Sequence, residues 1–129
     1  MIQTHAASFH LDAASGVPFY RQIIDQILAA IAIGSLTAGD RLPTVRQLAV
    51  DLAVNFNTVA RAYKELEIRG VLATQQGTGT FVADHEVRLD EVERRRRVDQ
   101  LLDEFLARAA RQGLSLEELR RALAERAEG

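Results

Sequence analysis

Two short helix patterns follow one another between residues 44 and 70 with only a tight turn between them, and this spacing constrains the fold more than any other feature of the chain. Thr44 and Gln47 have the spacing of a capping box at the start of the first helix, and Asn55 can cap the second. Ala53 and Val54 are left to form the turn. Apolar residues recur at helical intervals in both segments: Val45, Leu48, Ala49 and Leu52, then Val59, Ala62, Tyr63 and Leu66. Two short helices joined in this way predict a helix-turn-helix.

A longer helix pattern precedes this pair over residues 18–33, with apolar residues at intervals of three and four: Tyr20, Ile23, Ile24, Ile27, Leu28 and Ile31. Pro18 is expected at the first helical position, because the N–H that proline lacks is not needed there. Gly34 is expected just after the last turn, where glycine commonly ends a helix. The chain should therefore begin with an irregular lead-in, residues 1–16, followed by one long helix.

Two β-prone runs follow the pair, at residues 71–75 and 80–83, on either side of a glycine-containing turn at 76–79. This arrangement predicts a hairpin. Helix, helix-turn-helix and hairpin in this order make a winged helix-turn-helix, a mainly α fold with a small β-hairpin. We place a domain boundary where the hairpin ends, so that residues 1–83 form this domain and residues 84–129 form a short two-helix region.

The last third of the chain returns to a helical pattern. Residues 86–112 are expected to form a helix that Gly113 interrupts. Ser115 and Glu118 have the spacing of a second capping box. A short last helix should follow, with Leu116, Leu119 and Leu123 on one face.

Composition restricts the class of protein. The chain has 129 residues, 47% of them hydrophobic, which suits one ordinary domain with a short appendage. It has no cysteine, which excludes disulfides, zinc–thiolate sites and thiol nucleophiles. No apolar run approaches the roughly 20 residues that span a bilayer, and the first residues do not resemble a signal peptide. We expect a soluble cytoplasmic protein with no membrane partner and no cofactor.

The net charge of −2 provides no general attraction to nucleic acid. Residues 1–83 carry six basic and six acidic side chains, and residues 84–129 carry ten and twelve. Any binding of DNA by the first region must therefore depend on locally clustered cations and on helix N-termini.

The second helix of the pair carries polar side chains on its outward face: Asn57, Thr58, Arg61, Lys64 and Glu65. A helix fits the major groove, where asparagine can pair with adenine and arginine with guanine. The first residues of a recognition helix usually lie nearest the bases. A merely solvated face would have the same pattern, and some helix-turn-helix domains bind only proteins. Periodicity alone leaves these alternatives open.

Five runs of residues, in the same order along the chain, resemble the DNA-binding domain of the bacterial GntR family of transcription regulators. They are residues 18–23 (PFYRQI), 34–49 (GSLTAGDRLPTVRQLA), 54–66 (VNFNTVARAYKEL), 70–72 (GVL) and 77–82 (GTGTFV). The resemblance extends over about residues 9–83. The VNFNTVARAY form and the short tail are similar to the YtrA-like subfamily, whose members have two C-terminal helices used for dimerisation.

The resemblance implies which residues contact double-stranded DNA: Arg46, Asn55, Phe56, Asn57, Thr58, Arg61, Lys64, Gln76, Gly77, Thr78 and Gly79. Arg46 would touch the DNA backbone or a base at the groove edge, and residues 76–79 would lie over the minor groove. Phe56 and Thr78 depart from many relatives, which have proline or arginine at the first position and lysine or arginine at the second. Loss of a wing cation predicts a shallow dependence of affinity on salt.

An apolar stripe in the region of residues 84–129 predicts a buried contact: Val98, Leu101, Leu102, Phe105 and Ala109. It would either pack on its own domain or form a two-fold homodimer, which the subfamily resemblance favours. A two-fold dimer reads an inverted repeat with half-sites about one DNA turn apart. The basic run of residues 94–97 is expected to be a solvated face paired with nearby carboxylates, and it is given no site role.

Other functions have weaker support. There is no glycine-rich phosphate loop and no arrangement of Ser, His and Asp typical of nucleophilic catalysis, so we predict no catalytic residues and no enzyme. Metal binding by His5, His10 and His85 with Asp84 and Glu86 is conceivable, but scattered histidines are more often structural, and no metal site is predicted. A small-molecule effector stays open, with the dimer interface as its expected site. The resemblance implies a repressor of a transporter operon and of its own gene.

Overall fold

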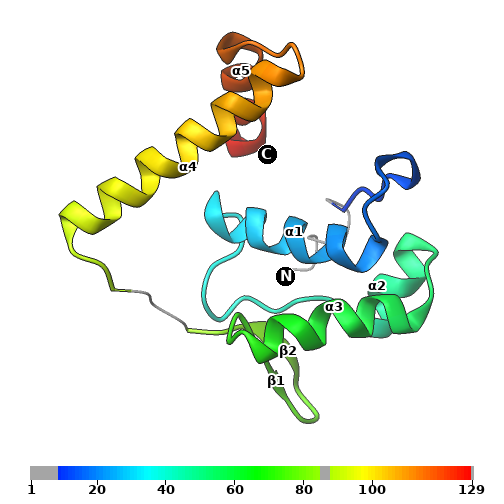
Figure 1. Cartoon of the computed structure of the whole chain (residues 1–129). Helices are drawn as coiled ribbons and strands as arrows, with labels where there is room; N and C mark the ends of the chain where they lie inside the picture. The colour runs from blue at the N-terminus through cyan, green and yellow to red at the C-terminus, as the bar shows by residue number, and fades with distance from the viewer. Residues whose placement is uncertain (1–8, 85–87, 129) are drawn as a thin grey trace. The chain divides into compact units, whose positions relative to one another are not determined.

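The structure, a computed structural model, describes residues 9–84 and 88–128. It separates into two compact units, residues 1–85 and 86–129. In chain order the elements are η2 Ala13–Ser15, α1 Phe19–Ala32, α2 Val45–Leu52, α3 Phe56–Ile68, β1 Leu72–Gln75, β2 Gly79–Val82, α4 Glu91–Arg111 and α5 Leu116–Glu128 (Figure 1). The helices with one antiparallel hairpin confirm the predicted fold class.

The first unit is built around α3, against which α1 and α2 both pack (Figure 1). Its core consists of buried apolar side chains from all three helices, the segment before α2 and the hairpin: Ile23, Ile24, Ile27, Leu36, Leu42, Leu48, Ala49, Val59, Ala62, Tyr63, Leu66, Leu72 and Val82. The Tyr63 hydroxyl donates a hydrogen bond of 2.7 Å to the Pro43 carbonyl oxygen, and burial raises the pKa of Tyr63. The predicted inward face of α3 is confirmed.

Pro18 is the N-cap of α1 and not its first helical residue, so the prediction for Pro18 was wrong by one position. Its ψ of 145° is extended, and the helix begins at Phe19. Gly34 follows the last turn with φ +86°, as expected of the glycine that ends a helix.

The lead-in before α1 is held to that helix by two glutamines, which the sequence did not reveal. The buried Gln22 accepts from the Asp12 amide at 2.8 Å and donates to carbonyl oxygens of Asp12 and Val17 at 3.0 and 2.8 Å. Gln26 bonds to the amide and the carbonyl of His10 in the same way. Side-chain amides therefore replace the backbone pairing that this segment lacks.

The helix caps predicted for the helix-turn-helix are present in the structure. Thr44 and Gln47 form a complete capping box at the start of α2. Ala53 ends α2 in the left-handed conformation with φ 57°, and among the described residues it is the one non-glycine residue with positive φ. The Asn55 side chain then caps α3. The turn is tight because one left-handed residue reverses the chain direction directly into the next cap.

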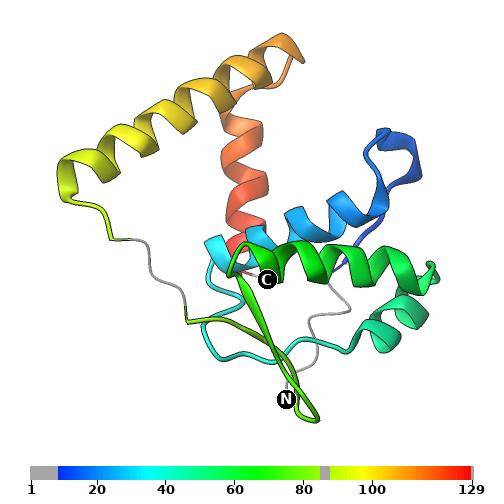
Figure 2. The same ribbon diagram turned by 60° about the horizontal axis from the view of Figure 1, so that its bottom comes forward.

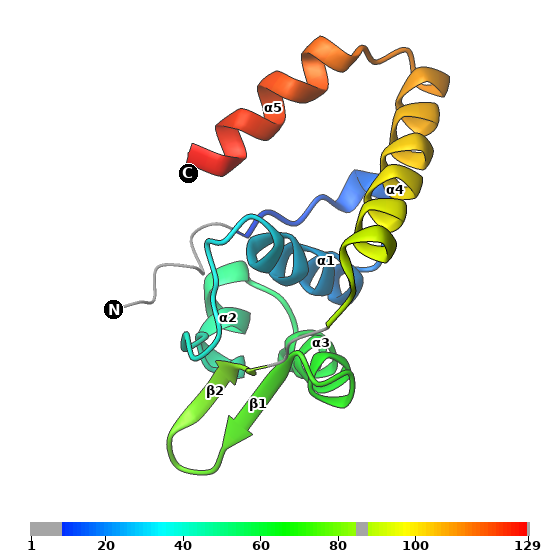
Figure 3. The ribbon, with the colours of Figure 1, turned by 90° about the vertical axis from the view of Figure 1, so that its left-hand side faces the viewer.

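The wing is wider than a two-stranded hairpin, because residues just before α2 pair with it. In the hairpin Leu72 is opposite Val82 and Gln75 is opposite Gly79, so Gly79 is the first residue of β2 and not part of the turn. Along the other edge of β2, Arg41 forms a β-bridge with Phe81, and the Leu42 amide donates to the Thr80 carbonyl at 2.8 Å. Figure 3 shows the hairpin extending away from the helices of this unit.

The second unit is a pair of helices. Asp90 caps α4 by accepting from the Glu93 amide at 2.7 Å, so the helix begins at Glu91 and not at residue 86 as predicted. Residues 86 and 87 lie outside the described ranges. Gly113, with φ +78°, lies in the break between α4 and α5 (Figure 2). The predicted capping box of Ser115 and Glu118 is present. Within residues 9–84 and 88–128, no helix has both the length and the apolar character needed to cross a bilayer.

Candidate nucleic-acid interface

The outward face of α3 carries three exposed side chains that can donate hydrogen bonds: Asn57, Arg61 and Lys64. Their spacing of four and three residues places them on one side of the helix. Thr58 is half-buried beside them. The structure therefore brings these predicted residues together on a single stripe opposite the core.

The two asparagines at the start of α3 have different roles. The Asn55 Oδ1 atom accepts from the Asn57 amide at 2.7 Å, so the helix cap uses part of its capacity to accept hydrogen bonds. The Asn57 side chain makes no hydrogen bond with the residues that the structure describes. Because bidentate pairing with adenine needs both the oxygen and the nitrogen of the amide, Asn57 is the asparagine equipped for it.

Arg46 on α2 lies near the first residue of α3. Its guanidinium carbon is 5.9 Å from the centre of the Phe56 ring, which is within the range of a cation–π contact. Phe56 is half-exposed at 48%. The half-exposed Phe56 ring therefore lies beside the Arg46 cation.

Arg61 is also held by an aromatic ring. Its guanidinium carbon lies 3.8 Å from the centre of the Tyr20 ring on α1, and its Nε is 3.9 Å from Glu65. The Tyr20 and Arg61 side chains line an open hollow of about 510 Å³ between the beginnings of α1 and α3. The other residues that line it are Pro18, Phe19, Asn55, Asn57 and Thr58. Tyr20 was predicted only as an apolar core residue, so its contact with Arg61 is a new feature of the site.

The wing tip consists of Gln76, Gly77 and Thr78, all exposed. Gly77 has φ +80°, and the Thr78 amide closes the turn on the Gln75 carbonyl at 2.9 Å. The tip is thus a tight backbone turn with no cationic side chain of its own.

Arg41 is a basic residue of the wing that sequence reasoning missed. A Cβ atom added to Gly79 would lie only 3.0 Å from the Arg41 Nε, so the arginine crosses the wing directly over this glycine. The contact joins residues far apart in sequence. The local signal, an arginine before Leu42 and Pro43, does not reveal that residue 41 pairs with β2.

The predicted apolar stripe of α4 is solvent-exposed over most of its length. Val98, Leu101, Leu102 and Phe105 are 44%, 65%, 49% and 53% exposed. Ala109 differs because it is buried, and the Leu114 amide donates to its carbonyl at the turn into α5. Four of the five predicted residues therefore offer an uncovered apolar surface.

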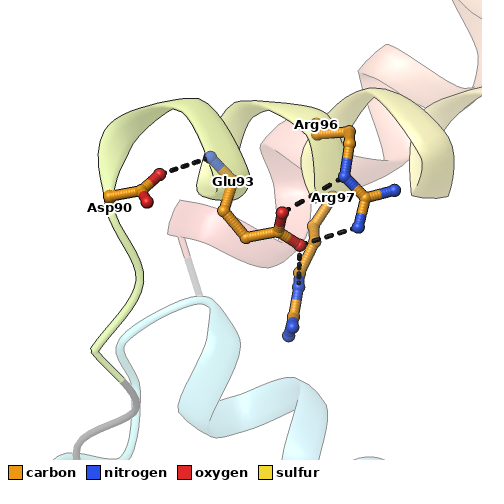
Figure 4. Close-up of polar contacts among 4 residues, drawn as sticks. All are labelled: Asp90, Glu93, Arg96 and Arg97. Atoms are coloured by element: carbon orange, nitrogen blue, oxygen red, sulfur yellow. Dashed lines mark hydrogen bonds and ion pairs between the residues drawn. The ribbon is translucent and has the colours of Figure 1, made fainter.

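Arginines of the basic run of residues 94–97 pair with carboxylates along their helix, as predicted. Glu93 accepts from Arg96 at 2.7 Å and from Arg97 at 3.0 Å (Figure 4). Arg95 lies 3.1 Å from Asp99. Hydrogen bonds from Arg96 and then Arg97 lower the pKa of Glu93 from 4.5 to about 2. Of the residues considered for a metal, His5, His85 and Glu86 lie outside the described ranges, and the described residues contain no cluster of three potential metal ligands.

Comparisons with known proteins identify the family of this chain. Residues 19–82 match the family of bacterial regulatory proteins, gntR family. The chain is 37% identical over 81% of its length to an uncharacterised HTH-type transcriptional regulator, YhcF, of Bacillus subtilis, of which the match covers 86%. It is 43% identical over 58% of its length to the HTH-type transcriptional repressor YtrA of the same organism, and this match spans 58% of YtrA.

Solved structures of other proteins are also similar to this one. YtrA from Sulfolobus acidocaldarius, a GntR-family transcription factor, has a TM-score of 0.56 and 36% identity, over 77% of this chain and 97% of that one. The DNA-binding domain of AraR in complex with its operator ORE1 has a TM-score of 0.50 and 31% identity, over 57% of this chain and 90% of that one. The chain is therefore a YtrA-like transcriptional regulator of the GntR family, which is a family of DNA-binding regulators and not of enzymes.

Proposed function

We propose that this regulator is a cytoplasmic repressor that binds an inverted-repeat operator as a homodimer and controls a transporter operon together with its own gene. In this proposal residues 1–83 read the DNA and residues 84–129 hold two copies together. An effector, if the protein has one, binds at the interface between the copies.

The observation that carries the proposal is the uncovered start of α3. Asn57 has a free side-chain amide, and an arginine stands on either side of it, Arg46 over Phe56 and Arg61 over Tyr20. Amide and guanidinium groups are the side chains that read adenine and guanine in the major groove. The two ring contacts place these cationic donors beside the free amide before any DNA is bound.

The second support is the apolar surface of α4. Burying a large apolar side chain is worth about 1.5–3 kcal/mol, so a stripe with Phe105 and Leu101 exposed is unfavourable in water. A two-fold partner would cover the same stripe on both copies. Two copies related in this way present two α3 helices to successive turns of the major groove.

Selection of genomic DNA fragments by the purified chain tests the proposal. We expect an inverted repeat with half-site centres about 10 base pairs apart, enriched upstream of the protein's own gene and of transporter genes. Insertion of about five base pairs between the half-sites is the matched control and should abolish tight binding. A motif without symmetry would contradict the dimer, and the absence of any specific fragment would favour a protein-binding winged helix.

The dependence of affinity on salt gives an independent test of the site. The logarithm of the binding constant falls with the logarithm of salt concentration by about 0.9 per phosphate neutralised. With no cation at the wing tip, we expect a slope shallower than about −8. A steeper slope would mean that the phosphate contacts have been undercounted.

A further inference from the structure

We infer that Tyr20 on α1 is a positioning residue for DNA recognition, because its ring holds the Arg61 guanidinium at the groove-facing side of α3. The inference rests on the proposed DNA-binding function and adds α1, outside the two helices of the helix-turn-helix, to the elements that contribute to DNA binding.

The first step of the argument is the rigidity of Tyr20. It lies in the first turn of α1, one turn before Ile23 and Ile24, which are 0% and 1% exposed in the core. These anchors fix the helix and hence the base of the Tyr20 side chain. Tyr20 is half-buried, so its ring has less freedom than a side chain in open solvent.

The second step is the way Arg61 is held. The guanidinium carbon is 3.8 Å from the ring centre, close to van der Waals contact, whereas the Arg46 guanidinium is 5.9 Å from Phe56. Its ion-pair partner Glu65 is 3.9 Å from Nε, too distant for a hydrogen bond, and Arg61 makes no hydrogen bond with the residues that the structure describes. The N–H groups of Arg61 are therefore not consumed by the contact that positions the side chain.

The third step concerns what Arg61 can bind. A guanidinium that rests on a ring while its N–H donors stay unused is ready for an acceptor with two oxygens or an oxygen and a nitrogen. In a duplex this chemistry is found at the O6 and N7 edge of guanine and at a phosphate. Holding the long side chain in advance lowers the entropy lost on binding, so the ring increases affinity without touching DNA.

The Tyr20 hydroxyl makes no hydrogen bond with the described residues, which makes Tyr20→Phe the matched control. The experiment measures the affinity of the full chain for its selected operator and for a scrambled duplex. We expect Tyr20→Leu to weaken operator binding by between about threefold and thirtyfold, the range of a cation–π contact at exposed to desolvated sites. Tyr20→Phe should stay within about twofold of wild type. An equal loss in both variants would overturn the inference, because the hydroxyl and not the ring would then be responsible.

A double-mutant cycle separates positioning from general stability. If Tyr20 acts through Arg61, then Tyr20→Leu should weaken binding no further in an Arg61→Ala background. Two losses that simply add would overturn the inference. If Arg61→Ala relaxes the preference at one base pair, the acceptor is a guanine edge. If it instead weakens all duplexes and reduces the salt slope by about one, the acceptor is a phosphate, and Tyr20→Leu should follow Arg61→Ala in either case.

A measurement on the free wild-type chain tests the inference even if a variant fails to fold. The side-chain protons of Arg61 should show the upfield NMR shift of groups above an aromatic ring, and this shift should vanish in Tyr20→Leu. Arg61 resonances at ordinary positions in wild type would overturn the inference without any DNA. If the shift is present but wild type binds no specific duplex, then the proposed function fails while the ring contact stands.

Discussion

The two units, residues 1–85 and residues 86–129, differ in how far their apolar side chains are buried. The first buries thirteen of them in one core that includes every one of its α-helices and strands. In the second, Ala109 is the one buried side chain among the described residues, and Phe105 and Leu101 are more than half exposed. The first unit has a core of its own, whereas α4 and α5 have local caps and ion pairs, and in the proposed homodimer a second copy covers the apolar stripe of α4.

The largest expected effect comes from breaking the proposed partner contact of the second unit. Phe105→Ala removes one buried ring from each copy of a two-fold dimer, at about 1.5–3 kcal/mol per ring. We expect the dissociation constant of the dimer, measured by sedimentation, to rise at least a hundredfold. Asp103→Ala, on another side of the same helix, is the control and should leave it unchanged. A dilute monomer that binds operator tightly would contradict the proposed role of the second unit as a dimer contact.

The core of the first unit gives the next largest effect. Leu66 is 0% exposed on α3, and replacing it with alanine should lower the free energy of unfolding by about 2–5 kcal/mol. Urea denaturation measures this loss. Ile68→Ala on the same helix, at a side chain 74% exposed, should change stability by less than about 0.5 kcal/mol. Equal effects of the two variants would mean that α3 is not packed as described.

The two capping boxes test the same difference between the units, with smaller expected changes in stability. Thr44→Ala should lower the free energy of unfolding of the first unit by about 1 kcal/mol, because α2 is packed into its core. Ser115→Ala removes the same kind of cap from α5, which has no buried residue. We expect its effect to be confined to faster amide hydrogen exchange in the first turn of α5. Global destabilisation by Ser115→Ala would show that α5 belongs to a cooperative core.

The smallest effect concerns acid pH at the start of α4. The pKa of Glu93 is lowered from 4.5 to about 2 by its arginine partners, so ionised Glu93 stabilises the folded helix. This contribution is complete above pH 4.5 and disappears as the pH falls toward 2. A carbon-detected NMR titration should give a midpoint near 2 in wild type and a higher one in the variant Arg96→Gln. A wild-type midpoint near 4.5 would mean that the ion pairs do not persist in solution.

These contrasts also explain what could be predicted from the sequence. The capping boxes at Thr44 and Ser115 and the glycine after α1 depend on residues within a few positions of each other, so the sequence reveals them. The start of α4 was predicted too early because the apolar periodicity already begins before Asp90, the residue that caps the helix. Gln22, Arg41 and Tyr20 were missed because their contacts join segments that only the folded chain brings together. The stripe of Asn57, Arg61 and Lys64 was predictable from helical spacing, but the rings that hold the arginines were not.

The backbone pairing of residues 40–42 with β2 has a consequence for how this protein can evolve. The bonds from the Leu42 amide to the Thr80 carbonyl and from the Val82 amide to the Asp40 carbonyl, each 2.8 Å, do not depend on which side chains the wing carries. They connect the hairpin to the segment that leads into α2. Substitutions at Gln76 and Thr78, including a change to lysine, can therefore alter the charge of the wing tip while these backbone bonds still fix the hairpin to the segment before α2.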